Sequence, residues 1–384
     1  MLKTLRDLRP VYVAGIGFHP YQRPSEDTSL VQLGITAVRA ALNDAGLRYG
    51  DVDNVYTGTA TSGMAVTRPV LAYLGATGVA MTQVDNASAS GSSAVRLAAI
   101  AVASGVSDVS LALGLDKRLN VVNAASFTGL PSLTRDHVAP AAHFALLASE
   151  YMDTHGATPE QLARVAVKNH RNGSLNACAQ RQKERSLEEV IGDRVVSGVL
   201  TRLQCCPVGE GAAAVLIVSD DAIERLELDR DRCVRILSSA STSEELYGAK
   251  SHDAELTRAT TATALRQAGV QAGQLDVIEL HDAFTIEELQ YTEAMGLCGE
   301  GEAARETEAG AFDIGGRVAV SASGGLLAMG HPVGPTGVGQ VAEITRQLRG
   351  EAGPRQQPGA RYGLAHMVGL GAVCVVHALA APGT

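Results

Sequence analysis

Hydrophobic and polar positions follow a pattern that occurs twice along the chain. Residues 11–17 (VYVAGIG) read as a buried strand, and residues 41–56 (ALNDAGLRYGDVDNVY) read as the end of an amphipathic helix, a glycine stop and another strand. Residues 234–240 and 264–279 repeat this order, with Ala, Leu, Ala, Gly and Asp recurring in step. Repeated units of strand, helix and strand predict an α/β fold with a largely buried sheet.

Two further pairs of segments extend the repeat. Residues 88–105 and 334–350 each place a turn of small residues before a helix that ends at glycine, and residues 211–219 and 371–379 read as closing strands. Because small residues allow close packing, we expect the two central helices to be almost wholly buried. The chain is therefore predicted to contain two copies of one α/β unit, packed against each other.

A long polar stretch interrupts the first copy. Within it, residues 143–156 and 158–173 have helical patterns, and we expect this stretch to cover the site as an inserted loop domain. The expected divisions are an N-terminal half, an inserted loop domain and a C-terminal half, at residues 1–118 with 196–226, 119–195 and 227–384.

Composition and charge narrow the class of protein. Hydrophobic residues make up 46% of the 384 and charged residues 19%, an ordinary balance for a globular enzyme, and a net charge of −9 without a basic stripe argues against nucleic-acid binding. No apolar run approaches the ~20 residues of a membrane helix, and the first residues lead into a strand pattern rather than a signal peptide. The six cysteines lack paired metal-ligand spacing, so we expect no bound metal and inert thiols in a reducing cytoplasm.

The first candidate for chemistry is Ser88, at the tip of the strand-to-helix turn within residues 84–95 (VDNASASGSSAV). A helix N-terminus presents unpaired N–H groups that favour an anion or a developing oxyanion. The same pattern fits a structural role, in which Ser88 or Ser90 only caps the helix.

Histidines supply the next candidates. Residues 324–337 (GGLLAMGHPVGPTG) fix His331, directly after Gly330, on a rigid glycine-rich turn. His281 and Asp282 follow an apolar strand, at the kind of strand end where α/β sheets bind ligands, although Asp282 would equally cap the helix that follows.

Two more histidines lie close to predicted turns or polar segments. His366 precedes a Gly-Leu-Gly turn, from Gly369 to Gly371, at the start of the last strand. His143 lies in the inserted domain, where it either reaches the site or is an ordinary helix residue.

Together these segments resemble the motifs of thiolases, in the branch typified by the thiolase domain of sterol carrier protein X. Residues 86–91 (NASASG) are similar to the nucleophile loop, 330–337 (GHPVGPTG) to the GHP motif and 281–284 (HDAF) to the HDCF motif of that branch. Residues 203–217 (LQCCPVGEGAAAVLI) also resemble the branch, with Glu210 where Asp is usual. The resemblance spans essentially the whole chain. It implies a five-layered αβαβα thiolase fold, made of two duplicated βαβαβαββ halves plus the inserted loop domain, usually as a homodimer.

The resemblance also implies roles for the candidates. Residue 88 would accept the acyl group, with its own N–H and the turn from Gly369 to Gly371 forming one oxyanion hole. His331 would activate this nucleophile and help to polarise the thioester carbonyl. His281 would help to hold a carbonyl or a water in a second oxyanion hole.

Two departures fall at the centre of the implied mechanism. The nucleophile is Ser88 rather than Cys, and Ala283 occupies the place of the acid/base cysteine, while the place used by other branches holds Met367. Cys298 and Cys374 match neither position. A serine hydroxyl attacks only with an aligned base. Losing the α-proton base disfavours Claisen condensation, because a general base contributes ~10²–10⁴ in rate.

Four readings of the function follow. In the one we expect, Ser88 with His331 as base takes an acyl group from a CoA or carrier thioester and passes it to another acceptor. In the second, the chain is a retro-aldolase that cleaves a β-hydroxyacyl-CoA, as in steroid side-chain-cleaving relatives, with Tyr151 or Tyr291 as candidate acid. In the third, it is a non-catalytic thiolase-like binding subunit. In the fourth, Ser88 is an engineered replacement that traps a substrate complex.

The resemblance also bears on ligands and partners. It implies a coenzyme A thioester as substrate and no permanently bound cofactor. Relatives in this branch often bind a small zinc-ribbon/OB-fold (DUF35-type) protein, and because this chain has no Cys₄ zinc pattern, such a module would be a separate chain.

Overall fold

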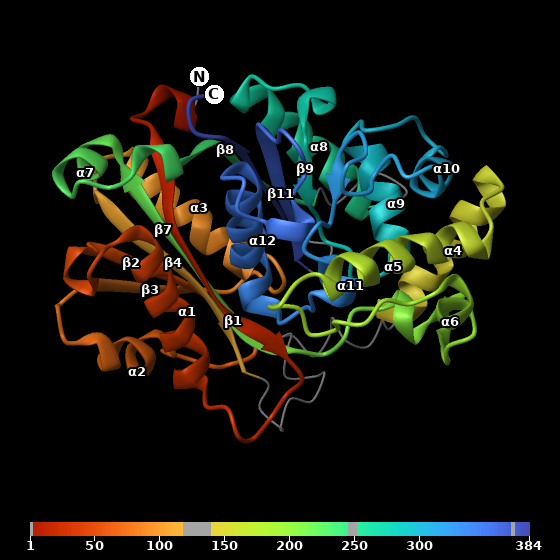
Figure 1. The fold of residues 1–384 in the computed structure, drawn as a ribbon, viewed down its shortest axis with the longest axis horizontal. Helices are drawn as coiled ribbons and strands as arrows, with labels where there is room; N and C mark the ends of the chain where they lie inside the picture. Colours follow the sequence, from red (N-terminus) through yellow and green to blue (C-terminus); the bar gives the residue numbers. More distant parts are fainter. Residues whose placement is uncertain (1–2, 118–139, 245–251, 370–372) are drawn as a thin grey trace.

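The computed structural model describes residues 3–117, 140–244, 252–369 and 373–384. Their strands form a ten-stranded sheet in the order β10-β9-β11-β12-β8-β1-β7-β4-β2-β3, and a separate pair, β5-β6 (Figure 1). Between β8 and β1 the pairing is short, with Tyr12 opposite Arg235 and Val13 opposite Val234. The sheet is therefore two half-sheets joined along this line.

The N-terminal half-sheet and its helices come from the first copy of the repeat. Its elements are β1 (Val11–Gln22), α1 (Leu30–Ala45), β2 (Asn54–Gly58), α2 (Thr67–Leu71), β3 (Ala80–Val84), α3 (Ser90–Ala103), β4 (Val109–Asp116) and β7 (Glu210–Ser219), followed by α7 (Asp220–Arg225).

The C-terminal half-sheet comes from the second copy. Its elements are β8 (Val234–Ser243), α8 (His252–Ala268), β9 (Val277–Glu279), α9 (Thr285–Ala294), α10 (Ala303–Glu308), β10 (Ala319–Val320), α11 (Gly325–Ala328), α12 (Val333–Leu348), β11 (Tyr362–Gly369) and β12 (Val373–Ala380).

Both half-sheets have the same strand order and the same directions. In the first, β3, β2 and β4 are parallel and β7 and β1 follow in antiparallel pairing. In the second, β10, β9 and β11 are parallel and β12 and β8 follow in antiparallel pairing. This topology confirms the repeat predicted from the sequence, including the correspondence of α3 with α12.

Helices cover both faces of the half-sheets, because successive strand residues point to opposite faces. Along β7, the even-numbered residues from 212 to 218 pack with α1, and the odd-numbered residues from 213 to 217 pack with α3 and α12. On the C-terminal half, α8 packs against β8 and β12. The layers run α1, half-sheet, α3 with α12, half-sheet and α8, which confirms the five-layered αβαβα fold.

Glycine permits the close approach of α3 and α12. A Cβ added to Gly91 would overlap the carbonyl oxygen of Gly334, and one added to Gly337 would overlap Ser92. A carboxylate reinforces the contact, since Asp116 at the end of β4 accepts the Gly334 N–H at 2.5 Å. The first turns of two helices from different copies therefore meet, together with the turns that precede them.

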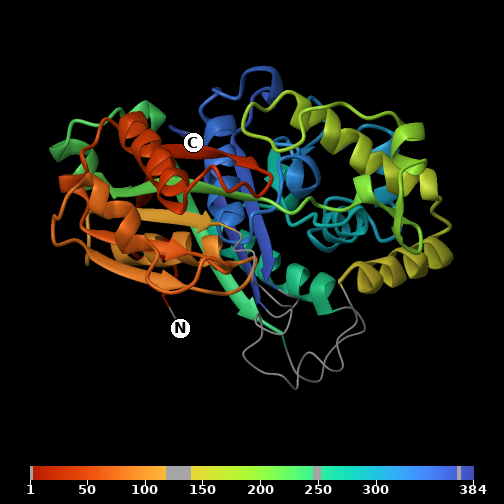
Figure 2. The same ribbon diagram turned by 90° about the horizontal axis from the view of Figure 1, so that it is seen from below.

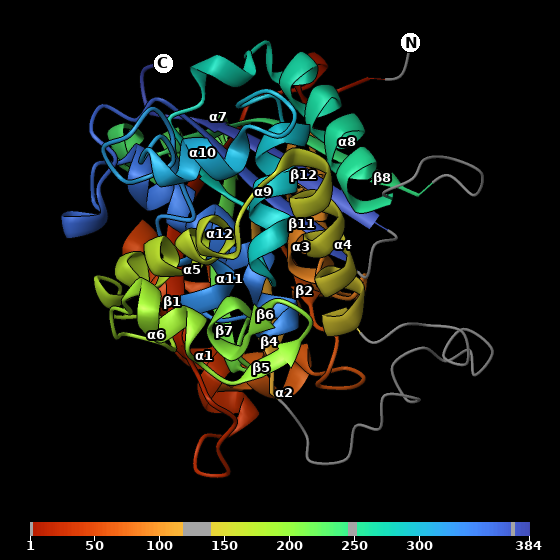
Figure 3. The ribbon, with the colours of Figure 1, turned by 90° about the vertical axis from the view of Figure 1, so that its right-hand side faces the viewer.

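The inserted segment packs on the C-terminal half, although it interrupts the first copy (Figures 2 and 3). Its helices α4 (Pro140–His155) and α5 (Pro159–Ser174) confirm the two helical patterns, and they are followed by α6 (Leu187–Ile191), β5 (Val195–Ser197) and β6 (Leu200–Thr201). Ala148 and Leu162 share one hydrophobic core with Leu289 of α9 and Leu327 of α11. The expected domain limits stay a prediction.

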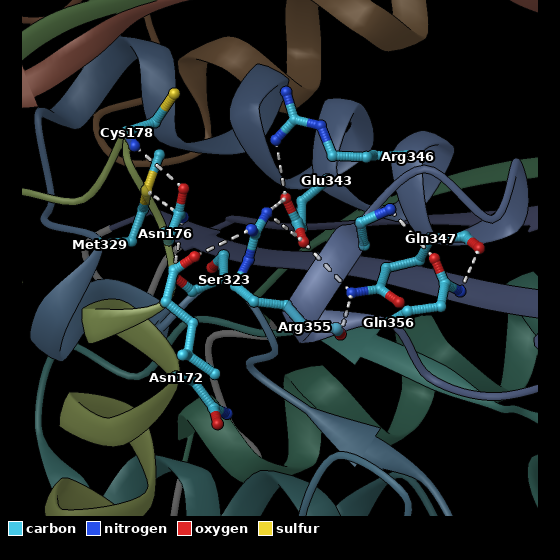
Figure 4. A network of polar contacts seen from close by, with 12 residues as sticks. Asn172, Asn176, Cys178, Ser323, Met329, Glu343, Arg346, Gln347, Arg355 and Gln356 are labelled. Atoms are coloured by element: carbon cyan, nitrogen blue, oxygen red, sulfur yellow. Dashed lines mark hydrogen bonds and ion pairs between the residues drawn. The ribbon is translucent and has the colours of Figure 1, made fainter.

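A buried polar network ties the end of α5 to α12 (Figure 4). Arg355 contacts both carboxylate oxygens of Glu343 in α12, at 2.8 and 3.0 Å, and donates to the carbonyl of Leu175, the C-cap of α5, at 3.5 Å. Asn176 donates to the carbonyl of Ser323 at 2.9 Å. Ser323 donates its N–H and its hydroxyl to Glu279, at 2.8 and 2.6 Å. Burial, and then the nearby Glu343 carboxylate, raises the pKa of Glu279 to about 8.

Replacing Glu279 should change how stability depends on pH. Between the ordinary pKa of 4.5 and about 8, the folded chain keeps a proton on Glu279 that the unfolded chain has lost. Stability contributed by this group is therefore present below pH 4.5 and is lost as pH rises through this window. Glu279→Gln removes the titration, so its free energy of unfolding, measured by urea denaturation, should fall less steeply from about pH 5 to about pH 9.

The exposed Glu184→Gln is the matched control for this measurement, and its curve should follow that of the wild type. Parallel curves for Glu279→Gln and the wild type would contradict the prediction.

Candidate functional site

Ser88 lies on the turn between β3 and α3 and does not cap the helix. The N-cap residue of α3 is Ala89, which makes no side-chain cap. The Ser90 hydroxyl holds the turn instead, because its oxygen accepts the Asn86 N–H at 2.9 Å and its proton goes to the Ala87 carbonyl at 2.6 Å. Ala87 has a φ of 49°, a left-handed conformation that is uncommon for alanine. The capping alternative is therefore wrong, and the turn presents Ser88 on a constrained backbone.

His331 reaches Ser88 from the turn before α12. Its Nε2 lies 3.0 Å from Ser88 Oγ, and its Nδ1 lies 3.0 Å from Thr336 Oγ1. The Thr336 hydroxyl donates its single proton to the Pro332 carbonyl at 2.6 Å, so its oxygen accepts from Nδ1–H. This network assigns the His331 proton to Nδ1 and leaves Nε2 as the acceptor for the Ser88 hydroxyl.

The surroundings of His331 keep it neutral. Burial, and then the nearby His281, lowers the pKa of His331 well below its ordinary value of 6.5. The preceding Gly330 has a φ of 108°, and a Cβ there would lie 2.9 Å from the side-chain oxygen of Gln180, so glycine is required at this position. A neutral imidazole at a fixed distance is the form that a general base requires.

His281 follows β9, and its ring contacts that of His331. The two ring centroids are 5.3 Å apart and the planes are nearly perpendicular, at 87°. His281 Nδ1 lies 2.8 Å from Glu287 Oε1, and Glu287 also accepts the Phe284 N–H at 2.8 Å and the Tyr291 hydroxyl at 3.2 Å. His281 Nε2 is buried and has no hydrogen-bond partner among the described residues.

Asp282 is buried and holds neighbouring elements together. Its Oδ1 accepts the Leu326 N–H at the start of α11, and its Oδ2 accepts from the Asn169 amide, both at 2.7 Å. Burial, and then the nearby Glu288, raises the pKa of Asp282 well above its ordinary range. The alternative in which Asp282 caps the following helix α9 is therefore wrong, because its side chain accepts the Leu326 N–H of α11 instead.

His366 lies within β11, and not at the start of the last strand as expected from the sequence. The backbone N–H of His281 donates to His366 Nδ1 at 3.4 Å, a long contact. Gly369 ends the same strand, and a Cβ there would overlap the carbonyl oxygen of Asn86, so β11 touches the Ser88 turn. Gly371 lies outside the described residues.

The remaining candidates from the sequence have other contacts. His143 is exposed on α4 and contacts Phe144, which in turn stacks on Phe284 with the ring centroids 4.7 Å apart. Helix α4 therefore contacts the segment that carries His281 through Phe144 and not through His143. Tyr151 donates to Glu293 at 2.5 Å.

No thiol occupies the two positions discussed for the acid/base cysteine. Ala283 is buried, and Met367 packs in the core against Ala89. Burial raises the pKa of Cys298 and of Cys374 to about 12 each, so both are protonated at neutral pH.

Sequence reasoning did not find that residues 205–208 bridge the two histidine motifs. The Cys206 N–H donates to the Ala283 carbonyl at 2.8 Å, and Val208 forms a β-bridge with His331. The motif Cys205-Cys206-Pro207 is evident in the sequence. No local pattern, however, shows which distant segments a short extended segment will pair with.

A cavity of about 610 Å³ opens beside this segment and is lined in part by Cys206 and Val208. Its described lining also includes basic residues from separate parts of the chain, namely Arg23, Arg181, Lys183, Arg185 and Arg202. Arg181, Lys183 and Arg185 lie within one short stretch of the sequence, and Arg23 and Arg202 join them through folding. Part of this positive charge is balanced within the protein, since Arg202 pairs with Asp193, and Lys183 and Arg185 both pair with Glu189.

Two further tests concern metals and membranes. Among the residues with coordinates, no group of three or more His, Cys, Asp or Glu side chains is arranged to hold a metal ion. In the same part of the chain, none of the helices combines the length and apolar character needed to cross a membrane.

Comparisons with known proteins agree with this fold. Residues 16–186 match the family model described as thiolase, N-terminal domain, and residues 238–379 match thiolase C-terminal domain-like. The chain is 36% identical to sterol carrier protein 2 of Gallus gallus, over 98% of this chain and 73% of the relative. It is 34% identical to benzoylsuccinyl-CoA thiolase subunit BbsB of Thauera aromatica, over 94% of this chain and 95% of the relative.

A solved structure, the Ltp2-ChsH2(DUF35) aldolase, is similar over 98% of both chains, with a TM-score of 0.82 and 26% identity. The two matched domains, the relatives and the duplicated five-layered fold lead to one conclusion: this chain belongs to the thiolase family.

Proposed function

We propose that this thiolase-family enzyme transfers acyl groups from CoA or carrier thioesters through Ser88. The observation that carries the proposal is the 3.0 Å contact between Ser88 Oγ and His331 Nε2, in a tautomer assigned through Thr336. An aligned, neutral base is what a serine hydroxyl requires in order to attack a carbonyl.

In the first half-reaction, the Ser88 hydroxyl proton passes to His331 Nε2 while Oγ attacks the thioester carbonyl. As the resemblance to thiolases implies, the oxyanion that forms would be held by the backbone N–H of Ser88 and by the segment from Gly369 to Gly371. The carbon–sulfur bond then breaks, and coenzyme A leaves with the proton from His331. The acyl group stays on Ser88 as an oxygen ester.

Acyl transfer fits the surroundings of Ser88 better than Claisen condensation does. Condensation needs a base for the α-proton of the substrate, and Ala283 and Met367 supply none. Transfer from Ser88 to another acceptor forms no α-carbanion and therefore makes no such demand.

The basic cavity supports a coenzyme A thioester as the donor. Coenzyme A carries phosphate groups, and guanidinium groups bind phosphate through charge-assisted, often bidentate hydrogen bonds. The cavity reaches Cys206 and Val208, whose backbone adjoins Ala283 and His331. If coenzyme A binds in this cavity with its phosphates beside the arginines, the turn that carries His331 lies next to it.

Retro-aldol cleavage of a β-hydroxyacyl-CoA is the second candidate. It is favoured by the similarity to the solved Ltp2-ChsH2(DUF35) aldolase, at 26% identity and a TM-score of 0.82. Such a reaction needs a polarised thioester but no covalent adduct on Ser88, so the two candidates differ in a measurable intermediate. A non-catalytic binding role is the third, and it predicts neither adduct nor cleavage.

Two kinds of partner are also proposed. The name of the same solved aldolase includes a DUF35 component, so a separate DUF35-type chain is one proposed partner. A second copy of this chain is the other, joined along the edge strand β3, where Met81 is 41% exposed and the nearby Tyr73 is 67% exposed. An exposed strand edge with apolar side chains readily pairs with another chain.

The Ser88 adduct is the direct test of acyl transfer. After incubation with acetyl-CoA, intact-protein mass spectrometry should detect one acetyl group on the wild type and none on Ser88→Ala, while Ser88→Cys should be acylated faster because a thiol ionises more readily. An adduct that persists in Ser88→Ala would contradict the proposal. Aldehyde or ketone released from a β-hydroxyacyl-CoA without any adduct would favour the aldolase.

Thr336 should matter for the rate of acylation. Thr336→Val removes the acceptor for His331 Nδ1–H, and losing one neutral hydrogen bond of about 1 kcal/mol should slow acetylation of Ser88 roughly fivefold to tenfold. Thr336→Ser keeps the hydroxyl and is the matched control, with a rate close to that of the wild type. Equal rates for the Val and Ser variants, followed by quenched-flow mass spectrometry, would refute this role.

The homodimer is tested by mass in solution. Light scattering coupled to size-exclusion chromatography should give twice the 39.8 kDa chain mass for the wild type and a shift towards 39.8 kDa for Met81→Asp. Val195→Asp places the same charge on an exposed valine of β5 and should leave the dimer intact. A monomeric wild type, or a dimer unaffected by Met81→Asp, counts against the β3 interface.

A further inference from the structure

His281 supplies a functional group that the acylation step does not use. Its Nε2 is buried and without a hydrogen-bond partner in the described parts of the chain, and its ring contacts that of His331. Leaving a buried polar atom unpaired costs free energy, so a group bound beside His281 Nε2 would supply the missing hydrogen bond. The His281 ring contacts His331, and His331 Nε2 in turn lies 3.0 Å from Ser88 Oγ, so His281 is close to the acyl-accepting residue.

Glu287 determines the protonation pattern of His281. Three groups approach its carboxylate as donors: His281 Nδ1 at 2.8 Å, the Phe284 N–H at 2.8 Å and the Tyr291 hydroxyl at 3.2 Å. A carboxylate that accepts all three leaves the proton of neutral His281 on Nδ1. Nε2 is then a lone-pair acceptor, which takes up a proton and does not donate to a carbonyl oxygen. This differs from the oxyanion role that the family resemblance implies for His281.

The partners of the two histidines differ in charge. His331 donates through Nδ1 to the neutral Thr336 hydroxyl, whereas His281 donates to a carboxylate. A carboxylate fixes the tautomer and stabilises the imidazolium that forms when the other nitrogen takes a proton. The pair of His281 and Glu287 is therefore arranged for proton uptake at Nε2.

We infer that His281, positioned by Glu287, is the base that activates a hydroxyl acceptor, water or an alcohol, for attack on the acyl group of Ser88. The inference rests on the proposed acyl transfer. A thiol acceptor, with an ordinary pKa of about 8.5, ionises without much help, but a hydroxyl does not. The oxygen ester on Ser88 is also less activated than a thioester, so an acceptor hydroxyl needs a paired base.

The second half-reaction then balances as follows. The acceptor O–H proton passes to His281 Nε2 while the acceptor oxygen forms a bond to the acyl carbon. The tetrahedral centre collapses, the bond from this carbon to Ser88 Oγ breaks, and the proton held by His281 returns to Ser88 Oγ. The product is a carboxylic acid or an ester, and both histidines end neutral.

Separating the two half-reactions tests the assignment. With acetyl-CoA as the probe, release of the coenzyme A thiol in a stopped-flow instrument should show a burst from acylation and a slower steady phase from deacylation. Glu287→Gln should keep the burst rate within about twofold and slow the steady phase about 100-fold, the order of a general-base contribution, with acetyl-Ser88 accumulating. His281→Asn should give the same pattern and serves as a second variant.

The control is Glu293→Gln, the same substitution at a buried glutamate on the same helix, which binds Tyr151 instead of a histidine. Both of its phases should match the wild type. Equal slowing of the burst and the steady phase in Glu287→Gln would overturn the inference, because His281 would then assist acylation. Kinetics of Glu287→Gln that equal those of the wild type would also overturn it. Absence of acetyl-Ser88 in the wild type would instead refute the underlying acyl transfer.

The acceptor is identified in the same reaction. Acetate that contains oxygen from oxygen-18-labelled water supports water, and an acetyl ester formed with added hexanol or glycerol supports an alcohol. Both outcomes agree with a hydroxyl acceptor. Turnover that requires an added thiol and is unaffected by Glu287→Gln would overturn the assignment.

Discussion

The contact between the first turns of α3 and α12 is the steric constraint on which the site depends. Gly91 and Gly334 approach so closely that a Cβ on Gly91 would overlap the Gly334 carbonyl, and the Asp116 carboxylate binds the Gly334 N–H from the end of β4. Ser88 precedes one helix and His331 precedes the other. Their 3.0 Å contact therefore follows from how closely the two copies of the repeat can pack.

Hydrogen-bond partners then give two histidines of the same site different properties. The Nδ1 proton of His331 goes to the Thr336 hydroxyl, whose own proton is held by the Pro332 carbonyl. The Nδ1 of His281 contacts the Glu287 carboxylate. In both rings Nε2 is left as an acceptor. Among the described residues, only the His281 ring donates through Nδ1 to a carboxylate, that of Glu287. This asymmetry matches a sequence of two proton transfers, first from serine and then from an acceptor.

The surroundings of the site combine a rigid interior with an open, basic side. Arg355 pairs with Glu343 of α12 and donates to the Leu175 carbonyl just after α5, so a buried network joins the inserted segment to α12. On the other side, residues 205–208 contact both histidine motifs and also line the basic cavity. A charged donor such as a coenzyme A thioester could thus bind outside the apolar core while its reactive end approaches Ser88.

The five-layered order came from the resemblance to thiolases, whereas the repeat and the segments that carry Ser88, His281 and His331 could be predicted from the residues themselves. These features depend on hydrophobic periodicity and on turn residues, which are local and recur in step between the two copies. The roles of Ser90, Asp282 and His366 were not predictable in the same way, because a capping pattern or a strand end looks the same whichever distant group it meets.

Which side chains share hydrogen bonds depends on the three-dimensional fold. In the sequence, Glu287 does not differ from other acidic residues of a predicted helix. Its contact with His281 depends on how the turn after β9 folds back towards that helix. Arg23 and Arg202 of the cavity lie far along the sequence from Arg181, and chain folding brings them together. Periodicity reports which face of an element is buried, whereas the position of a proton or a charge depends on pairwise distances between side chains, which no local pattern contains.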